Sequence, residues 1–274
     1  MKKILVPTDF SSQAFNAVKS AASIARGNDT EIILLHIIDL PQETMDMIRP
    51  GYDLPEIILF KEAAEQKLRE VAQAPELANI TVSIVLRLGK TFNEVNDVAK
   101  ENNVDLIVMG SHGASGFKEL FIGSNTEKVV RSSEIPVLVI KSQGSDIRFD
   151  NVVFASDFLE DNTVAYNKIL SFLKERNAKP HFLMVNTPNS FKPTHESERI
   201  IQEFLSQLTV EDHHFAVYSD FEIEKGITNY ANRINADLIV MGTHGRKGFS
   251  RFINGSISED VVNHSERNII TFKM

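Results

Sequence analysis

The chain contains one long motif twice, once in each half. The stretch MGSHGASGFKELFIGSNTEKVV occupies residues 109–130, and MGTHGRKGFSRFINGSISEDVV occupies residues 241–262, which is 132 positions later. The segments KKILVPTDFSSQA and DNVVFASDFLEDN, near the start of each half, also match, with an offset of 148. Self-similarity at this scale indicates a duplicated structural unit. The sequence therefore predicts two domains of one fold, over residues 1–143 and 147–274.

The two offsets differ by about 16 residues, so the first half carries an insertion between its first strand and its glycine loop. Region 41–57 is the expected place, because it contains three prolines and shows no clear period. Its apolar residues include Met45, Met47, Ile48, Tyr52 and Leu54. We expect them either to cover the domain's own core or to form a mobile cover or partner-binding surface.

Within each half, short apolar runs alternate with helical patterns. In the first half, KILVPT, EIILLHII, TVSIVLRLG, DLIVMG and VLVIK are rich in β-branched residues and favour strands. The segment SSQAFNAVKSAASIA places five small apolar residues on one helical face, with Ser11 or Ser12 as N-cap. Apolar strands separated by helices indicate a parallel sheet with right-handed crossovers. Each half should be a doubly wound α/β domain that binds ligands at the carboxyl ends of its strands.

Composition limits what these domains can bind. The 274 residues carry a formal net charge of −8, so no overall positive field would recruit nucleic acid or an anionic membrane. The chain has no cysteine, which excludes disulfides and thiolate chemistry. No apolar run approaches the roughly 18 residues of a membrane span, and the N-terminus lacks a signal-peptide core. We expect a cytoplasmic protein with neither a nucleic-acid nor a membrane partner.

The repeated loop has the features of an anion site. In each half a glycine directly follows the predicted strand, a second lies three residues on, and a Gly-Ser pair then opens the last helix. Glycine lets the backbone approach phosphate oxygens, and the first N–H groups of a helix attract anions. The hydroxyls of Ser124 and Thr126 could add donors. One copy alone would be explained by a tight turn and a helix cap, but two copies in the same place favour phosphate binding.

An aspartate follows the first predicted strand of each half, Asp9 in the first and Asp157 in the second. At a strand end each would flank the glycine loop and could accept hydrogen bonds from a sugar hydroxyl or a base amine. The alternative is a helix N-cap, which is stronger in the first half because DFSS offers several capping residues.

The loop carries no recognisable catalytic machinery. The G-x-x-x-x-G-K-[ST] loop of NTPases is absent, and so is an arginine finger or a general base fixed beside the glycines. The S-G-G-x-[ST] loop of the ATP pyrophosphatases is absent too. We expect His112 and His244 to fix their turns by hydrogen bonding, and the pair His213–His214 to be exposed without a metal. No catalytic residue and no protein metal ligand is therefore assigned, while slow ATP hydrolysis stays open.

The sequence resembles the universal stress protein family in its tandem two-domain form. The resemblance covers nearly the whole chain and rests on G-x-x-G-(nine)-G-S in both halves, on DLIVMGSHG, on the strand-end aspartate and on LLHIID. It implies two Rossmann-like domains of the adenine nucleotide alpha hydrolase-like type, each with five parallel strands in the order 3-2-1-4-5. It also implies dimerisation through the last strands, here an internal pseudo-dimer through VLVIK and NIITFK, and leaves a homodimer open.

The resemblance further implies ATP as the ligand, with Mg²⁺ as an optional companion. ATP-binding members hold adenine with backbone groups near the end of the second strand, here Ile37 or Ile38, and the phosphates with the glycine loop. The residues carried over to the first site are Pro7, Thr8, Asp9, Ile37, Met109, Gly110, Gly113, Gly123, Ser124 and Asn125. Those carried over to the second site are Ser156, Asp157, Asn186, Met241, Gly242, Gly245, Gly255, Ser256 and Ile257.

The second half departs from the family pattern. FLMVNTP replaces LLHIID and puts Asn186 or Thr187 at the adenine-facing turn, and DFLEDN lacks the serines after the aspartate. Its loop reads GRKGFSR, with three basic residues and no acid, whereas GASGFKE in the first half has one of each sign. The first site thus looks better suited to adenosine and the second to phosphate. Binding at the second should weaken more with salt.

Three functions remain open from the sequence. The first is a nucleotide-binding stress-response protein whose ATP occupancy switches its conformation or its binding to an unknown protein partner. The second is an interaction scaffold whose loops bind no nucleotide, and the third is a slow ATPase or another adenine-nucleotide enzyme. The paired loops and aspartates favour the first.

Overall fold

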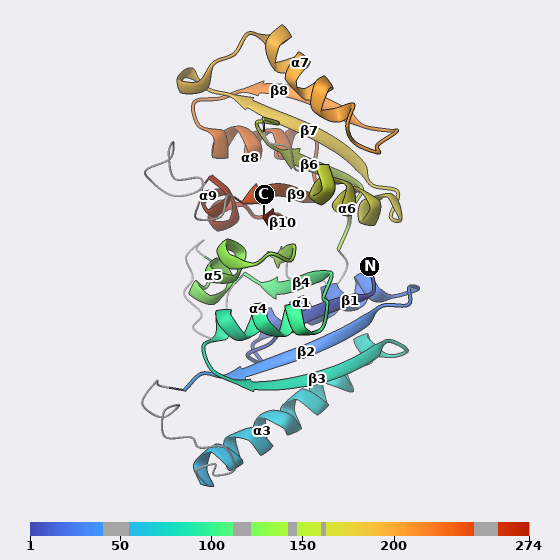
Figure 1. The fold of residues 1–274 in the computed structure, drawn as a ribbon, viewed down its shortest axis with the longest axis vertical. Helices are drawn as coiled ribbons and strands as arrows, with labels where there is room; N and C mark the ends of the chain where they lie inside the picture. Colours follow the sequence, from blue (N-terminus) through green and yellow to red (C-terminus); the bar gives the residue numbers. More distant parts are fainter. Residues whose placement is uncertain (41–54, 112–121, 142–146, 160–162, 244–256, 274) are drawn as a thin grey trace. The chain divides into compact units, whose positions relative to one another are not determined.

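A computed structural model gives the fold as two compact units, Met1–Asp146 and Ile147–Met274. Each unit is an α/β fold on a five-stranded parallel sheet, and its elements are labelled in Figure 1. The structure describes residues 1–40, 55–111, 122–141, 147–159, 163–243 and 257–273.

The first unit alternates strands and helices as its sequence predicts. Its elements are β1 (Lys3–Pro7), α1 (Ser12–Ala25), β2 (Glu31–Ile38), α3 (Pro55–Ala72), the 3₁₀ turn η1 (Pro75–Leu77), β3 (Thr81–Leu88), α4 (Thr91–Glu101), β4 (Leu106–Gly110), α5 (Ser124–Ser132) and β5 (Val137–Ile140). The strands lie in the order β3-β2-β1-β4-β5, and neighbouring strands are parallel. The predicted strand order is confirmed.

The second unit repeats the arrangement. Its elements are β6 (Asn151–Ala155), α6 (Thr163–Lys174), β7 (Lys179–Asn186), the 3₁₀ turn η2 (Pro188–Ser190), α7 (Thr194–Leu205), β8 (His214–Ser219), α8 (Ile223–Arg233), β9 (Leu238–Thr243), α9 (Ile257–His264) and β10 (Asn268–Lys273). The strand order β8-β7-β6-β9-β10 is that of the first unit, strand for strand. The duplication read from the sequence is therefore a duplication of the fold.

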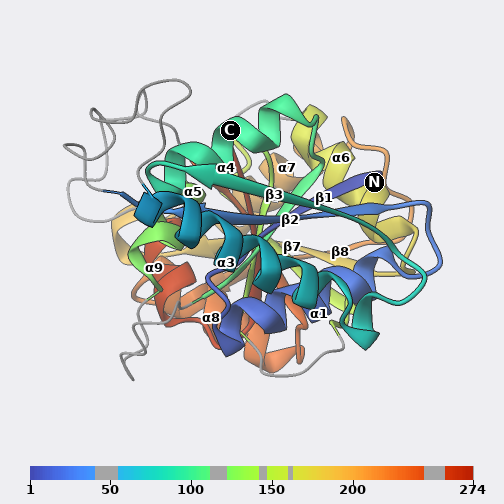
Figure 2. The same ribbon diagram turned by 90° about the horizontal axis from the view of Figure 1, so that it is seen from below.

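Helices cover both faces of the first sheet. Helix α1 packs against β1, β2 and β4, and α3 packs against β2 and β3 on the same face. Helices α4 and α5 pack against each other on the opposite face, as Figure 2 shows. Strands β1, β4 and β5 are buried along most of their length, as expected for strands covered on both sides. The prediction of a parallel sheet between two helical layers is confirmed.

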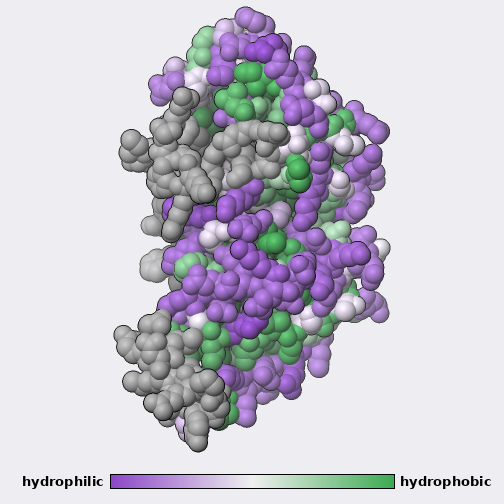
Figure 3. All heavy atoms as spheres, in the orientation of Figure 1, coloured by the Kyte–Doolittle hydropathy of each residue, from purple (hydrophilic) through white to green (hydrophobic). Residues whose placement is uncertain are grey.

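Strand β3, at the end of the strand order, is less covered than the central strands. After Thr81, which is exposed, each of its residues is only half-buried. Hydrophobic residues gather over this strand on the face seen in Figure 3. In the part of the chain that the structure describes, no helix is long and apolar enough to cross a membrane.

Helix α1 is capped and packed as its sequence predicts. Ser11 is the N-cap, because its hydroxyl oxygen accepts the backbone N–H of Ala14 at 3.1 Å. All five small apolar residues of the predicted face are buried. Their small side chains let the helix lie close to the sheet.

Helix α3 begins earlier than the sequence pattern predicts. The irregular region was expected to run to residue 57, but the helix starts at Pro55. A proline fits the first position of a helix, where its missing N–H has no intrahelical partner and its φ is already helical. Pro55 was counted among the three prolines of the irregular region, so the start of α3 was not predicted. The apolar residues expected between 45 and 54 lie outside the described residues.

Candidate functional site

The carboxyl ends of β1 and β4 lie side by side, because these strands are neighbours in the sheet. They are paired in register through Ile4 with Leu106 and Leu5 with Ile107. The strand order reverses between them, with β2 on one side and β5 on the other. This is the switch point at which doubly wound sheets bind ligands. Nine residues expected at the first site are at this edge or open the helix that follows it: Pro7, Thr8, Asp9, Ile37, Met109, Gly110, Gly123, Ser124 and Asn125.

Gly110, the last residue of β4, is where the start of α1 comes closest to the sheet. A Cβ atom at this position would lie 2.8 Å from the carbonyl oxygen of Gln13 and 3.0 Å from its carbonyl carbon. Those atoms belong to the backbone and cannot move aside without shifting the helix. Only glycine fits between the strand end and α1.

The start of α5 is tied to the end of β4 by two hydrogen bonds. The backbone N–H of Gly123 donates to the carbonyl oxygen of Ser111 at 2.7 Å. The hydroxyl of Thr126 donates to the carbonyl oxygen of Gly110 at 2.9 Å. The N-terminal end of α5 is therefore held beside the strand end, where its N–H groups and dipole favour an anion.

The two hydroxyls expected to serve as donors differ in their surroundings. Thr126 is 5% exposed, and its hydroxyl proton goes to the carbonyl of Gly110. A hydroxyl has one proton to donate, so Thr126 holds the helix in place instead of offering that proton to a ligand. The expectation for Thr126 was wrong in this respect. Ser124, in the first turn of α5, is exposed.

The turn after β1 presents Asp9 at the same edge. The carboxylate Oδ1 of Asp9 accepts the backbone N–H of Ser11 at 3.0 Å, and the hydroxyl oxygen of Thr8 accepts the N–H of Phe10 at 3.1 Å. Phe10 has a φ of 64°, which is uncommon for a residue with a side chain. The cap of α1 is Ser11, so the alternative role of Asp9 as N-cap is excluded. Asp9 shapes the turn that precedes the cap, with an exposed side chain.

His36 on β2 connects this turn to the second strand. Its Nδ1 donates to the carbonyl oxygen of Thr8 at 2.7 Å, and its ring centroid lies 4.4 Å from that of Phe10. His36 stood out in the sequence only as part of LLHIID, and no site role was predicted for it. A polar histidine inside an apolar strand could have indicated that this side chain has a hydrogen-bonding role.

A half-buried carboxyl group lies near the end of β2. The carbonyl oxygen of Ile38 accepts the N–H of Gly89 at 3.1 Å, and Gly89 has a φ of 146°. A Cβ atom on Gly89 would lie 2.7 Å from the carboxylate Oε1 of Glu94, so glycine leaves the room that this side chain occupies. Burial raises the pKa of Glu94 above its ordinary value, and the neighbouring Arg87 counteracts the rise.

The second unit builds the same turn from different residues. The hydroxyl oxygen of Ser156 accepts the N–H of Phe158 at 3.0 Å, and Oδ1 of Asp157 accepts the N–H of Leu159 at 3.2 Å. Phe158 also has a positive φ, 57°. Asp157 is thus placed on its strand end as Asp9 is on β1. The residues expected at this second edge and described by the structure are Ser156, Asp157, Asn186, Met241, Gly242 and Ile257.

The end of β7 differs from the end of β2. The side chain of Asn186 is buried and makes two hydrogen bonds with the backbone of Lys192, to its carbonyl oxygen at 2.7 Å and from its N–H at 2.8 Å. The hydroxyls of Thr187 and Ser190 lie 2.8 Å apart. The side chains of Asn186 and Thr187 therefore stabilise the η2 turn.

The middle of each glycine loop lies outside the described residues. This applies to Gly113 in the first half and to Gly245, Gly255 and Ser256 in the second. It applies equally to both loop histidines and to the charged residues that distinguish the two loops. In the described part of the chain, no three His, Cys, Asp or Glu side chains come together as metal ligands would.

The adjacent histidines were expected to be exposed, and this holds for only one of them. His214 is exposed, whereas His213 is half-buried with its ring centroid 6.0 Å from that of Phe182. The ring of His214 stacks on His181 of β7 at 4.8 Å. Burial, followed by the neighbouring His214 and Lys179, lowers the pKa of His181.

One family model matches each unit of the chain separately. The model of the universal stress protein family matches residues 1–141 and again residues 148–273. The chain belongs to the universal stress protein family. Universal stress protein MJ0577 of Methanocaldococcus jannaschii is 32% identical over 157 residues, which cover 53% of this chain and 97% of that protein.

Two further relatives match along both units. Universal stress protein Slr1230 of Synechocystis is 23% identical over 281 residues, covering 99% of this chain and 89% of that one. The crystal structure of a universal stress protein from Archaeoglobus fulgidus DSM 4304 superposes with a TM-score of 0.75 at 26% identity, covering 99% of this chain and 98% of that one. The tandem form of the family therefore accounts for the repeated motif.

Proposed function

We propose that this universal stress protein binds ATP at the carboxyl edge of its first unit, and that occupancy of this site changes its conformation or its binding to a protein partner. The observation that carries the proposal is the meeting of β4, α1 and α5 at Gly110, where a Cβ atom would lie 2.8 Å from the backbone of α1. The hydrogen bonds from Gly123 to Ser111 and from Thr126 to Gly110 hold the start of α5 at this same strand end, which is the switch point of the sheet.

The phosphates are assigned to the start of α5. Its N-terminal N–H groups point out of the helix, and the bond from Gly123 to Ser111 holds that end beside β4. A helix N-terminus at a strand edge favours negative charge through these N–H groups and the helix dipole. Ser124, exposed in the first turn, is placed to add a hydroxyl donor.

The adenosine is assigned to the ends of β1 and β2. The side chain of Asp9 is exposed at this edge, and an ionised carboxylate acts only as an acceptor. A ribose hydroxyl is a donor of the kind that this group accepts. Backbone groups near Ile37 would hold the base, as in ATP-binding members of the family. Any Mg²⁺ would arrive with the phosphates, since Mg²⁺ commonly binds through one or two carboxylates together with substrate phosphates.

Slow hydrolysis is the second candidate function. Asp9 contributes an exposed carboxylate to the edge at which the nucleotide is expected. Release of phosphate from ATP, measured with wild-type protein and with Asp9→Ala, distinguishes a binding protein from a slow ATPase. A rate that is lost with Asp9→Ala would favour the enzyme.

The test of the proposal is calorimetric titration with ATP and with GTP. We expect ATP to bind more tightly, and equal affinity for the two nucleotides or none for either would contradict the proposal. Gly123→Val should weaken ATP binding by at least about 2 kcal/mol, because the branched side chain occupies the approach of the phosphates. Gly123 has a φ of −62° and a ψ of 143°, which valine also adopts, so the loss would not come from backbone strain.

Gly255→Val is the matched variant in the second unit. If it abolishes ATP binding while Gly123→Val leaves the affinity unchanged, the nucleotide site is in the second unit. Thermal melting of both variants, followed by circular dichroism, shows that each is folded before its affinity is compared.

A further inference from the structure

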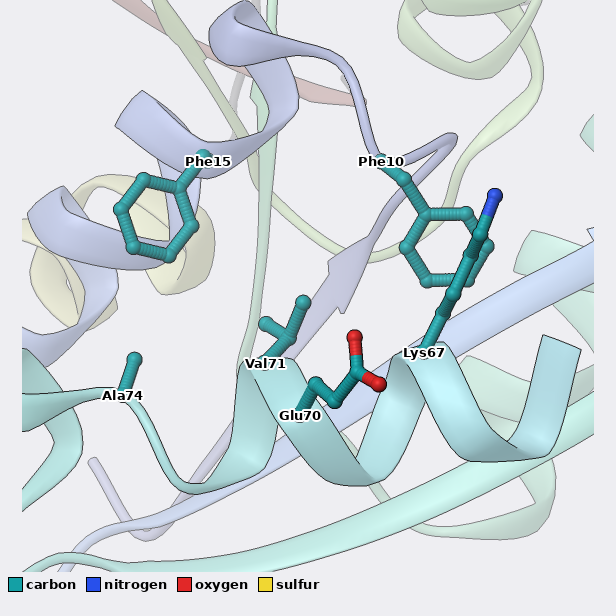
Figure 4. Close-up of a pocket in the computed structure, with 6 residues that line it drawn as sticks. All are labelled: Phe10, Phe15, Lys67, Glu70, Val71 and Ala74. Carbon is teal, nitrogen blue, oxygen red and sulfur yellow. The ribbon is translucent and has the colours of Figure 1, made fainter.

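An open groove lies between α1 and α3 of the first unit, beside the turn that follows β1. It has a volume of about 420 Å³, and Figure 4 shows Phe10 and Phe15 on opposite sides of it. The ring of Phe10 already contacts the ring of His36 and Nζ of Lys67. The charged lining residues, Lys67 and Glu70, have opposite signs. The groove therefore favours no single class of ligand.

The carboxyl group of Glu94, in the first turn of α4, is in a different situation. Among the residues that the structure describes, it makes neither a hydrogen bond nor an ion pair. The cations on the preceding strand and turn have other partners, because Arg87 pairs with Glu101 and Lys90 pairs with Asp39 at 2.8 Å. Burial raises the pKa of Glu94, so the fold holds its charged form at a cost in stability. Such a group is typical of functional sites.

This carboxylate lies at the corner where β2 and β3 end. The N–H of Gly89, the residue after β3, donates to the carbonyl oxygen of Ile38, the last residue of β2, at 3.1 Å. Oε1 of Glu94 lies 2.7 Å from the point where a Cβ atom of Gly89 would stand. Glu94 is therefore beside the strand end to which the base of the nucleotide is assigned.

The second unit places a carboxylate at the same corner from the opposite element. Asp220 takes the position of Gly89, because its N–H donates to the carbonyl oxygen of Asn186, the last residue of β7, at 3.1 Å. The glycine is now on the helix, since Gly226 is the fourth residue of α8, as Glu94 is of α4. A Cβ atom on Gly226 would lie 3.2 Å from the Cβ of Asp220. Each unit thus combines one acid with one glycine at this corner.

The two carboxylates differ in what satisfies them. Asp220 accepts Nδ2 of Asn229 at 2.9 Å and the N–H of Phe221 at 2.7 Å, and these hydrogen bonds lower its pKa. The first unit has Asp97 where the second has Asn229, 132 residues later. Asp97 offers no donor when ionised, and its charge adds to burial in raising the pKa of Glu94. The second unit therefore satisfies its carboxylate internally, while the first leaves it as an acceptor.

We propose that Glu94 selects the base at the first site by accepting a hydrogen bond from the exocyclic amine of adenine. This role depends on the ATP binding proposed above and determines the specificity of that site. A primary amine has two N–H groups, so it can donate to a backbone carbonyl near Ile37 and to Glu94 together. An ionised carboxylate only accepts, and it therefore disfavours a base that has a carbonyl oxygen in place of the amine.

The test compares ATP with purine riboside 5′-triphosphate, in which a hydrogen atom replaces the amine. In calorimetric titrations, wild-type protein should bind ATP at least about tenfold more tightly than this analogue. In Glu94→Ala the preference for ATP should fall about tenfold, because one charge-assisted hydrogen bond is lost, while the affinity for the analogue stays unchanged. Equal weakening of both nucleotides would show that Glu94 only supports the fold, and the proposal would be overturned.

Two further variants locate the contact. Asp97→Ala removes an exposed carboxylate one turn further along α4 and should leave the preference for ATP unchanged. A fall equal to that of Glu94→Ala would assign the preference to the local charge and not to a contact. Glu94→Asp keeps the charge but withdraws it by one methylene group, so most of the preference should be lost. If the full preference remains, the carboxylate does not contact the amine.

The wild-type titration separates the role of Glu94 from ATP binding itself. If wild-type protein binds neither nucleotide, the proposed function and the role of Glu94 fail together. If it prefers ATP and folded Glu94→Ala keeps that preference, only the role of Glu94 fails. Thermal melting followed by circular dichroism shows which variants are folded, and Glu94→Asp gives the comparison if Glu94→Ala is not.

Discussion

The turn that follows the first strand has the same backbone conformation in both units, but the surroundings of its phenylalanine side chain differ. Phe10 and Phe158 share a positive φ, and in each case a hydroxyl two residues earlier accepts the phenylalanine N–H. Phe158 is 5% exposed and packs against Phe204, whereas Phe10 lines an open groove. Local hydrogen bonds therefore set the conformation of the turn, and the helix packed beside it decides what the side chain does.

The loops that follow the second strands, β2 and β7, also differ between the units although the strands correspond. In the first unit the backbone at Ile38 faces Gly89 and the half-buried Glu94. In the second unit Asn186 is drawn into a turn by the backbone of Lys192. The two units share the framework of this sheet edge, while the second unit has side-chain hydrogen bonds that stabilise the loop after its second strand. We therefore expect matched substitutions to have different effects on the stability and ligand binding of the two units.

The largest difference should appear when the turn phenylalanine is truncated. Phe158→Ala removes a buried ring in contact with other aromatic rings, and we expect a loss of about 3–5 kcal/mol in the stability of the second unit. Phe10→Ala should cost less than half as much in the first unit, because its ring borders solvent. Amide hydrogen exchange measures the opening free energy of each unit separately. Equal losses would show that the groove does not leave Phe10 less well packed.

An intermediate difference is expected from the two strand-end aspartates. Asp9→Asn keeps an oxygen that can accept the N–H of Ser11 and so should preserve the turn, but it removes the charge. We expect ATP affinity to fall about tenfold, which corresponds to the loss of one charge-assisted hydrogen bond of about 1.5 kcal/mol. Asp157→Asn should leave the first site unchanged. Calorimetry measures both affinities.

The control for these variants is their thermal stability. If Asp9→Asn lowers the melting temperature and leaves ATP affinity intact, Asp9 is a structural residue and the adenosine assignment is wrong. If Asp157→Asn alone lowers the affinity, nucleotide binds in the second unit.

The smallest difference should be one of pH dependence. His181 on β7 pairs in register with Val153, as Ile33 on β2 pairs with Leu5, so the two residues are counterparts. Because burial lowers the pKa of His181, the unfolded chain binds a proton more readily, and its ordinary pKa is about 6.5. The stability that neutral His181 provides is present above that pH. It is lost as the pH falls from there through the lowered pKa of the folded state.

The measurement is the urea midpoint of the second unit at neutral and at mildly acidic pH. His181→Ile, which installs the residue of the first unit, should flatten the part of the pH dependence that comes from this site. An unchanged slope in this variant would assign the dependence to other groups.

Much of the fold was predictable because it depends on patterns that are local in the sequence. The apolar runs marked the strands, and DFSS contained the cap of α1 at Ser11. The strand order followed from the family resemblance, and the chain's 132-residue repeat assigned the same order to both halves. For the candidate site, the strand ends at Asp9 and Gly110 could be placed together because neighbouring parallel strands end at one edge.

Other features depend on contacts between residues far apart in the sequence. Thr126 donates its proton to Gly110, 16 residues earlier, so its hydroxyl could not be assigned from the loop alone. A phenylalanine with positive φ is disfavoured, so nothing in the sequence indicated the conformation of Phe10. The ring that fills the second unit but not the first depends on the packing of α7, and no short motif encodes it. These features determine how the two sheet edges differ. The sequence indicated that the edges differ but not in which contacts.

The contiguity of the two units has a consequence for synthesis of the protein. All five strands of the first unit come from residues before the second unit begins, and β5 is the last of them. A ribosome adds about 5–20 residues per second, so synthesis of the 128 residues of the second unit takes roughly 6–26 s after the first unit is complete. During that time the first sheet can close by itself, and its edge strands β3 and β5 could pair with other nascent chains. The first unit must therefore resist aggregation by itself before the rest of the protein exists.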